Sequence, residues 1–108
     1  MALVLTDENF DKEIQESVKP VLVDFFATWC GPCSVLGPIL EKIEEEMREQ
    51  FVLAKVDIDN SPRTAQKFNV DRVPMVFAFK GGKQIGGFVG LMPENNIKEW
   101  LEKTIKEN

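Results

Sequence analysis

The chain has 108 residues, of which 44% are hydrophobic and 29% charged, a balance typical of a globular protein rather than a disordered or collagen-like one. This length suits one domain over residues 1–108. The net charge of −5 and the scattering of the 13 Lys and Arg residues argue against a nucleic-acid partner. No apolar run approaches the roughly 18 residues that would cross a bilayer, so we expect no membrane association.

The N-terminus lacks a basic segment before its short apolar patch, so the sequence does not predict a signal peptide. The two cysteines lie in one tight motif, unlike the spread-out cysteines of a secreted disulfide framework. We therefore predict a cytoplasmic protein, and we expect a monomer.

The pattern of apolar residues predicts the first two secondary-structure elements. Residues 2–5 form a short apolar segment, which we interpret as a strand. Phe10, Ile14 and Val18 recur every fourth residue, which predicts a helix over about 7–17 with one buried stripe.

Residues 21–26 are apolar on both alternating faces, as in a central strand covered by helices on both sides, and Asp24 alone breaks this pattern. A helix is predicted over 34–47, and Pro38 within it is expected to cause a kink. Its expected buried face comprises Val35, Leu36, Ile39, Leu40, Ile43 and Met47. Its expected solvent face comprises Glu41, Lys42, Glu44, Glu45 and Arg48.

The second half of the chain alternates in the same way and then changes. The predicted segments are a strand over 51–58, a short helix over 62–69 with Ser61 as its N-cap, strands over 75–79 and 84–89 joined by a Gly81-Gly82 turn, and a helix from Pro93. Alternating strands and helices imply parallel strands, whereas the glycine turn requires an antiparallel hairpin. The sequence therefore predicts an α/β fold with a mixed sheet of four or five strands.

The stretch Trp29-Cys30-Gly31-Pro32-Cys33 contains both cysteines and lies between a predicted strand and a predicted helix. Free N–H groups and the positive end of the helix dipole favour a thiolate there. A closed zinc site needs four ligands, mostly Cys and His, and this chain has two Cys and no His. A structural disulfide would close too small a loop to constrain the unfolded chain much, so we favour redox use of the pair.

The two cysteines are expected to have different roles. Cys30 lies at or just outside the helix N-cap and is our candidate nucleophile, whereas Cys33 is one turn further in, is expected to be buried, and is our candidate resolving thiol. Gly31 permits close backbone approach, and Pro32 suits a first helical position because it needs no N–H there.

Asp24 and Lys55 are single charges within apolar strands. A carboxylate in such a strand should be neutral over part of the physiological pH range, paired, or both. One interpretation is a structural ion pair between these two residues. The other is that Asp24 moves the proton of Cys33 during resolution. Val73-Pro74 precedes the next strand; a cis bond there would expose the backbone of Val73 to an extended substrate, but the sequence does not determine the isomer.

Taken together, these residues resemble the thioredoxin family over nearly the whole chain. The resemblance rests on Trp29-Cys30-Gly31-Pro32-Cys33, on Val23-Asp24-Phe25 before it and Pro38 after it, and on Lys55-Val56-Asp57 and Val73-Pro74.

The resemblance implies a central mixed sheet flanked by four helices. It implies that Cys30 is the nucleophile and Cys33 the resolving thiol of a redox disulfide, that Asp24 is a buried proton-transfer group with Lys55 near it, and that Pro74 is cis. It further implies a shallow apolar substrate surface made of Trp29, Gly31, Pro32, Ile58, Val73, Pro74, Gly90 and Leu91. The implied activity is reduction of disulfides in partner proteins without a cofactor, with regeneration by a thioredoxin reductase or an equivalent donor.

Some positions depart from the family pattern. Ser34-Val35 stand where a basic residue and a methionine are common, Met75 where threonine is common, and Phe26 where a second tryptophan is frequent. Two other functions are compatible with the motif: a disulfide oxidant or isomerase of the same fold, and a binding module without redox turnover. The Gly31-Pro32 spacer argues against the first, and the presence of both thiols against the second.

Overall fold

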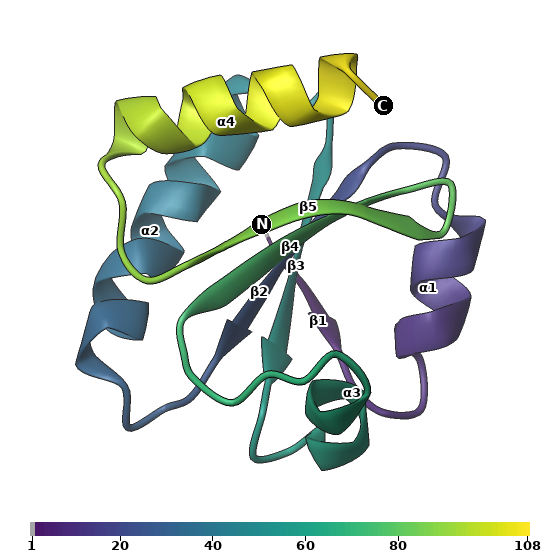
Figure 1. The fold of residues 1–108 in the computed structure, drawn as a ribbon, viewed down its shortest axis with the longest axis vertical. Helices are drawn as coiled ribbons and strands as arrows, with labels where there is room; N and C mark the ends of the chain where they lie inside the picture. The colour runs from purple at the N-terminus through teal and green to yellow at the C-terminus, as the bar shows by residue number, and fades with distance from the viewer. Residues whose placement is uncertain (1) are drawn as a thin grey trace.

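The computed structural model describes residues 2–108 and contains five strands and four helices in the predicted order (Figure 1). Their bounds are β1 (Leu3–Leu5), α1 (Phe10–Glu16), β2 (Val21–Phe26), α2 (Gly31–Glu46), β3 (Val52–Asp57), α3 (Pro62–Lys67), β4 (Met75–Lys80), β5 (Lys83–Val89) and α4 (Glu94–Lys106). The predicted α/β class is confirmed.

The five strands form one mixed sheet in the order β1-β3-β2-β4-β5. β3 pairs in parallel with both β1 and β2, whereas β4 pairs antiparallel with β2 and with β5. Gly81 and Gly82 form the turn of the β4–β5 hairpin at φ of 60° and 82°, a region that glycine adopts without steric cost. The parallel half and the antiparallel hairpin are both as predicted.

Helices cover the sheet on both sides, α2 and α4 on one face and α1 and α3 on the other (Figure 1). β2 lies at the centre and alternates between the two cores. Leu22 packs with residues of α2 and α4, while Val23 and Phe25 pack with Phe10 and Ile14 of α1. Asp24 has the same parity as Leu22, so its carboxyl is on the α2 side.

Helix α1 is shorter than the predicted 7–17 at both ends, since it begins at Phe10 and ends at Glu16. Val18, expected on its buried stripe, lies beyond the helix and is fully exposed. The spacing of apolar residues at every fourth position extends to Val18, but the backbone already becomes extended at Ser17.

Helix α2 starts earlier than predicted, at Gly31, and runs on through Pro38. Two assignments of its faces were wrong. Val35, expected on the buried face, is half exposed. Glu44, expected on the solvent face, is buried, and its carboxylate accepts a hydrogen bond from the N–H of Leu53 near the start of β3 at 3.2 Å.

Ser61 immediately precedes α3 as predicted, but its side chain makes no capping hydrogen bond. Asp7, near the N-terminus of the chain, caps α3 instead. Its carboxylate accepts hydrogen bonds from the N–H of Arg63 at 3.2 Å and from the N–H and the hydroxyl of Thr64, each at 2.7 Å. The loop before α1 is thereby tied to the start of α3.

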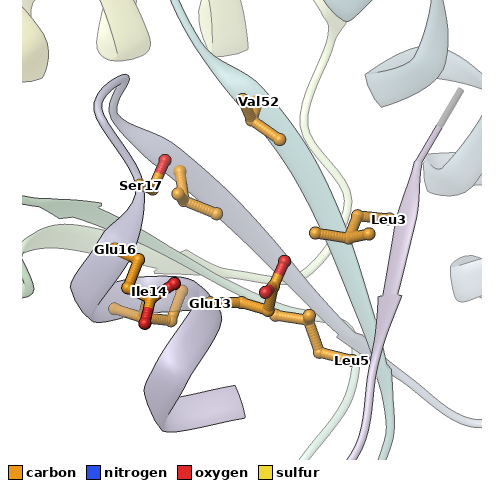
Figure 2. A pocket seen from close by; sticks show the side chains of 8 residues that line it. Leu3, Leu5, Glu13, Ile14, Glu16, Ser17 and Val52 are labelled. Atoms are coloured by element: carbon orange, nitrogen blue, oxygen red, sulfur yellow. The ribbon is translucent and has the colours of Figure 1, made fainter. Parts of the chain in front are cut away.

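A cavity of about 350 Å³ lies near the amino ends of β2 and β3, at the opposite end of these strands from the cysteines (Figure 2). Its walls are largely aliphatic, with Glu13 and Glu16 as the charged side chains among them. Over residues 2–108, none of the helices is both long enough and apolar enough to cross a membrane.

Candidate functional site

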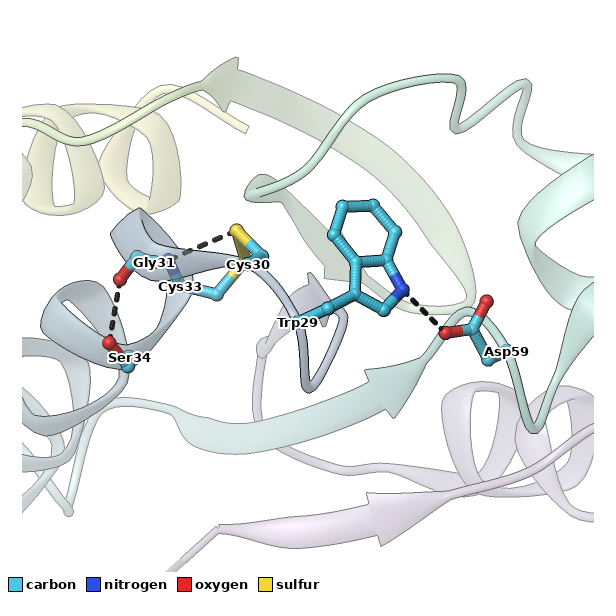
Figure 3. Close-up of a disulfide and its surroundings, with 6 residues drawn as sticks. All are labelled: Trp29, Cys30, Gly31, Cys33, Ser34 and Asp59. Atoms are coloured by element: carbon cyan, nitrogen blue, oxygen red, sulfur yellow. Dashed lines mark hydrogen bonds between the residues drawn. A yellow bond between two sulfur atoms is a disulfide. The ribbon is translucent and has the colours of Figure 1, made fainter.

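Cys30 and Cys33 form a disulfide at the start of α2, with their Cα atoms 5.3 Å apart (Figure 3). Cys30 is the N-cap residue, and its sulfur accepts a hydrogen bond from the backbone N–H of Cys33 at 3.2 Å. This N–H is one of the helix donors that lack an intrahelical partner. The sulfur of Cys30 therefore lies where the helix end favours negative charge.

The two cysteines are almost equally covered, with 8% of Cys30 and 6% of Cys33 exposed. The expected contrast in burial is thus absent from the disulfide form. Gly31 and Pro32 between them are exposed. Gly31 takes the first helical position and Pro32 the second, one place later than expected, where a proline still removes no intrahelical hydrogen bond.

Ser34 is exposed, and its hydroxyl donates a hydrogen bond to the carbonyl of Gly31 at 2.6 Å (Figure 3). This bond satisfies one acceptor within the first turn of α2 and brings no charge to the disulfide. The first turn of α2 contains no acidic residue either. The start of α2 therefore supplies positive potential to Cys30 through the helix end and not through a charged side chain of the first turn.

Trp29 precedes the disulfide and is 69% exposed. Its indole N–H donates a hydrogen bond to the carboxylate of Asp59 at 2.8 Å, which fixes the ring on the outside of the molecule (Figure 3). Asp59 was missed in the sequence analysis. The available signal was its position, since it follows Ile58 just past the carboxyl end of β3, the same sheet edge from which the cysteine loop leaves β2.

Two of the predicted surface residues lie against the disulfide. Ile58 and Val73 are partly buried and pack with Cys30 and Cys33. The Val73-Pro74 peptide bond is cis, as the resemblance implies. Pro74 itself is buried, so its ring adds less to an accessible surface than expected.

The segment after β5 is joined to this region through Pro74. The N–H of Gly90 donates a hydrogen bond to the carbonyl of Pro74 at 2.9 Å. Gly90 has a φ of 88°, a conformation that side-chain-bearing residues rarely adopt. Leu91 follows and is about half exposed.

Asp24 is 1% exposed, and its Oδ1 atom has no hydrogen-bond partner. Burial is the main cause that raises the pKa of its carboxyl from 3.8 to about 6, while Lys55 lowers this pKa and Glu41 raises it further. Lys55 lies opposite Asp24 in the β2–β3 register. No ion pair links the two side chains, both of which are within the described residues, so the structural ion pair considered from sequence is not formed.

The ammonium of Lys55 instead lies 5.0 Å from the ring centre of Phe26. Both residues line an open cavity of about 370 Å³ next to the disulfide, together with Cys33, Gly37 and Glu41. The cavity thus brings both cysteines, Lys55 and Glu41 to one space. Gly37 and Glu41 were not identified as site residues from sequence.

Known proteins match this sequence over nearly the whole chain. The family model described as Thioredoxin matches residues 1–103. A thioredoxin of Staphylococcus haemolyticus is 44% identical over 104 residues, covering 95% of this chain and 98% of that protein. A thioredoxin of Rickettsia felis is 39% identical over 105 residues, covering 97% and 100%. A thioredoxin 2 of Chlorobaculum tepidum is 40% identical over 100 residues, covering 93% and 92%.

The sheet, the helix-capped cysteine pair and these matches lead to one assignment. The chain belongs to the thioredoxin family and is a protein-disulfide reductase that works by dithiol–disulfide exchange through Cys30 and Cys33.

Proposed function

We propose that Cys30 is the attacking thiolate and Cys33 the resolving thiol of this reductase. The observation that carries this assignment is the hydrogen bond from the Cys33 N–H to the Cys30 sulfur at the N-cap of α2. A thiolate at this position is stabilised by that donor and by the helix dipole. Cys33, inside the first turn, has no comparable position at the helix end.

The exchange would proceed in two steps, in each of which a thiolate attacks a disulfide, forms one S–S bond and breaks another. The Cys30 thiolate attacks one sulfur of a partner disulfide, forms a mixed disulfide with it, and releases the other partner sulfur as a thiolate. The Cys33 thiolate then attacks the Cys30 sulfur, re-forms the Cys30–Cys33 bond, breaks the bond to the partner, and releases the second partner sulfur as a thiolate. Two electrons pass from the cysteine pair to the partner, and a reductase donor then supplies two electrons that reduce the Cys30–Cys33 disulfide again.

Asp24 is the proposed proton acceptor for Cys33 during the second step. A carboxyl with a pKa of about 6 can take up and release a proton near neutral pH. It faces α2 from the strand beneath the cysteines, and Lys55 is the charge that partly offsets its burial. The proton would pass directly or through a water in the neighbouring cavity.

The proposed substrate surface consists of exposed and half-buried groups around the disulfide. Trp29, Gly31, Pro32 and Leu91 are exposed, and Ile58, Val73 and Gly90 are partly so. Among the described residues, the N–H and the carbonyl of Val73 form no hydrogen bond. They could therefore pair with an extended segment of a partner protein. Pro74, which is buried, would shape this surface from below rather than contact the partner broadly.

We further propose that residues 1–108 form one domain that works as a monomer in the cytoplasm on disulfide-containing proteins. The support for a reducing compartment is that the only two cysteines of the sequence are both in the redox motif. The donor would be a thioredoxin reductase or an equivalent enzyme. Neither nucleic acid nor a membrane is part of this proposal.

The roles of the cysteines can be tested with Cys30→Ser and Cys33→Ser variants and a disulfide-bonded substrate protein. Cys30→Ser should lose reduction entirely, and Cys33→Ser should accumulate a mixed disulfide that is visible on a non-reducing gel. Activity retained by Cys30→Ser, or no trapped adduct with Cys33→Ser, would refute the assignment. A reduction potential well on the oxidising side would instead favour an oxidant or isomerase.

The role of Asp24 needs a separate measurement of the two steps. Asp24→Asn should slow resolution of the mixed disulfide more than it slows the initial attack. Equal slowing of both steps would leave Asp24 with a structural part only.

A further inference from the structure

Gly37 stands in the middle of α2 at a place where the local backbone does not require glycine. Its φ is not among the positive values of the chain, which occur at Asn69, Gly81, Gly82 and Gly90. Glycine in a helix interior is less favourable than alanine by about 1 kcal/mol. The reason for a residue without a side chain must therefore be sought in what Gly37 faces.

Gly37 is buried and faces the ammonium group of Lys55. A Cβ atom built on Gly37 would lie 3.3 Å from the Nζ atom, closer than an ordinary van der Waals contact. Apart from the residues adjacent to Gly37 and the helix's own backbone, no other atom of the described residues lies within 4 Å of that position. The missing side chain thus makes room for one group, the end of the lysine.

Lys55 and Asp24 are opposite one another on β3 and β2. The ammonium nevertheless lies over the ring of Phe26 and against Gly37, and one oxygen of the buried Asp24 carboxyl is left without a partner. The ammonium thus lies on the α2 side of the cavity, whose lining also includes Glu41.

The elements packed around Asp24 present both charged and uncharged side chains. α2 contributes Cys33 and Glu41 on the side of the cavity, and the buried Glu44 farther along, which binds the N–H of Leu53. β3 contributes Lys55 and, past it, the half-buried Asp57. β4 places the uncharged Val76 opposite Asp24. Lys55 is thus the one cation that acts on this carboxyl among the described residues.

We propose that Gly37 is a positioning residue, which by lacking a side chain keeps the Lys55 ammonium on the α2 side of the cavity and off the Asp24 carboxyl. The carboxyl then holds its proton more firmly than it would beside an ammonium at contact distance. The consequence for catalysis rests on the proposed proton-transfer role of Asp24. The placement of the charge itself can be measured without that role.

The test is Gly37→Ala, with the Asp24 carboxyl titrated by NMR in the reduced and in the oxidised protein. The added methyl should push the flexible end of Lys55 toward the sheet, where the carboxyl attracts it. The titration midpoint of Asp24 should then fall by on the order of one pH unit. Alanine is the most favourable residue in a helix interior, so the variant should fold. An unchanged or raised midpoint would overturn the proposal.

A second pair of variants separates the ammonium from general packing. Lys55→Met alone should raise the midpoint of Asp24, and Gly37→Ala added to Lys55→Met should produce no further change. If the methyl lowered the midpoint equally without the lysine, Gly37 would act through packing and the inference would be wrong.

The rate of resolution distinguishes this inference from the proposed function. If the Gly37→Ala midpoint falls and the pH profile of resolution moves with it, both are supported. If the midpoint falls and the pH profile stays in place, the placement of Lys55 by Gly37 stands and the proton-transfer role of Asp24 fails.

Discussion

Asp24 and Lys55 are register partners on β2 and β3, yet their side chains form no ion pair within the described structure. A buried carboxyl without a contacting cation bears most of its desolvation cost when it ionises. The raised pKa of Asp24 follows mainly from this burial. At neutral pH the ionised Asp24 carboxylate is therefore buried at a cost in free energy, which lowers the free energy of unfolding by an amount that can be measured.

Asp24→Asn should stabilise the protein at pH 8 but not at pH 4. A carboxyl whose pKa is about 6 when folded and 3.8 when unfolded costs nothing while protonated in both states. The cost appears as the pH rises from 3.8 to 6 and then stays constant, reaching about 3 kcal/mol at 1.36 kcal/mol per pH unit. Urea unfolding of both proteins across this range measures it. A stability difference independent of pH would contradict the buried, raised carboxyl.

Ser34→Lys should accelerate the attack of Cys30 on a partner disulfide. The residue is exposed in the first turn of α2, where an added cation would favour the thiolate. The gain should remain below about fivefold, since exposed charges contribute less than about 1 kcal/mol. Stopped-flow kinetics would measure the rate, with Ser34→Gln as the neutral control of comparable reach. The gain should shrink in high salt; an equal gain with glutamine would point to a cause other than charge.

Asp59→Ala should weaken substrate binding while leaving the chemical step almost unchanged. Without its acceptor, the exposed indole of Trp29 loses the bond that fixes its orientation. A net hydrogen-bond contribution of this kind corresponds to a rise of roughly two- to tenfold in KM. Trp29 fluorescence anisotropy should fall in parallel. Asp59→Asn keeps an acceptor oxygen and should recover most of the loss; no recovery would indicate that the charge, not the bond, is needed.

Much of the fold could be predicted from the apolar pattern, because each element is identified by its own local period. The two-faced run of β2 indicated a central strand, and the Gly81-Gly82 turn indicated the hairpin. Val18 shows the limit of this reasoning. A repeat of four residues says which face a helix buries but not where the backbone leaves the helix.

The site residues that could be predicted from the sequence are those whose residue type or local spacing is itself unusual. Asp24 was identified because one carboxyl interrupts an apolar strand, and the cysteines because of their spacing. The placement of the Lys55 ammonium beside Gly37 and the bond between Trp29 and Asp59 bring together residues that are 18 and 30 positions apart, respectively. Such contacts depend on how α2 and the loops lie over the sheet, which no local pattern encodes.

Asp7→Ala should lower the melting temperature, because three donors at the start of α3 lose their acceptor. The hydroxyl of Thr64 is the main cause that holds the pKa of Asp7 below its usual 3.8. The stabilisation is therefore complete above that value and is lost as the pH falls through the lower pKa of the folded state. Thermal melts across the acid range should show the gap between wild type and Asp7→Ala closing as the pH drops.

Asp7→Asn is the matched control for this cap, because it keeps one acceptor oxygen for Thr64 but cannot ionise. It should melt between the other two proteins at neutral pH, and it should lack the steep loss of stability that ionisable Asp7 confers on wild type in acid. If Asp7→Asn were as unstable as Asp7→Ala at neutral pH, the cap would depend on the charge of Asp7 interacting with the helix end and Arg63 rather than on its hydrogen bonds.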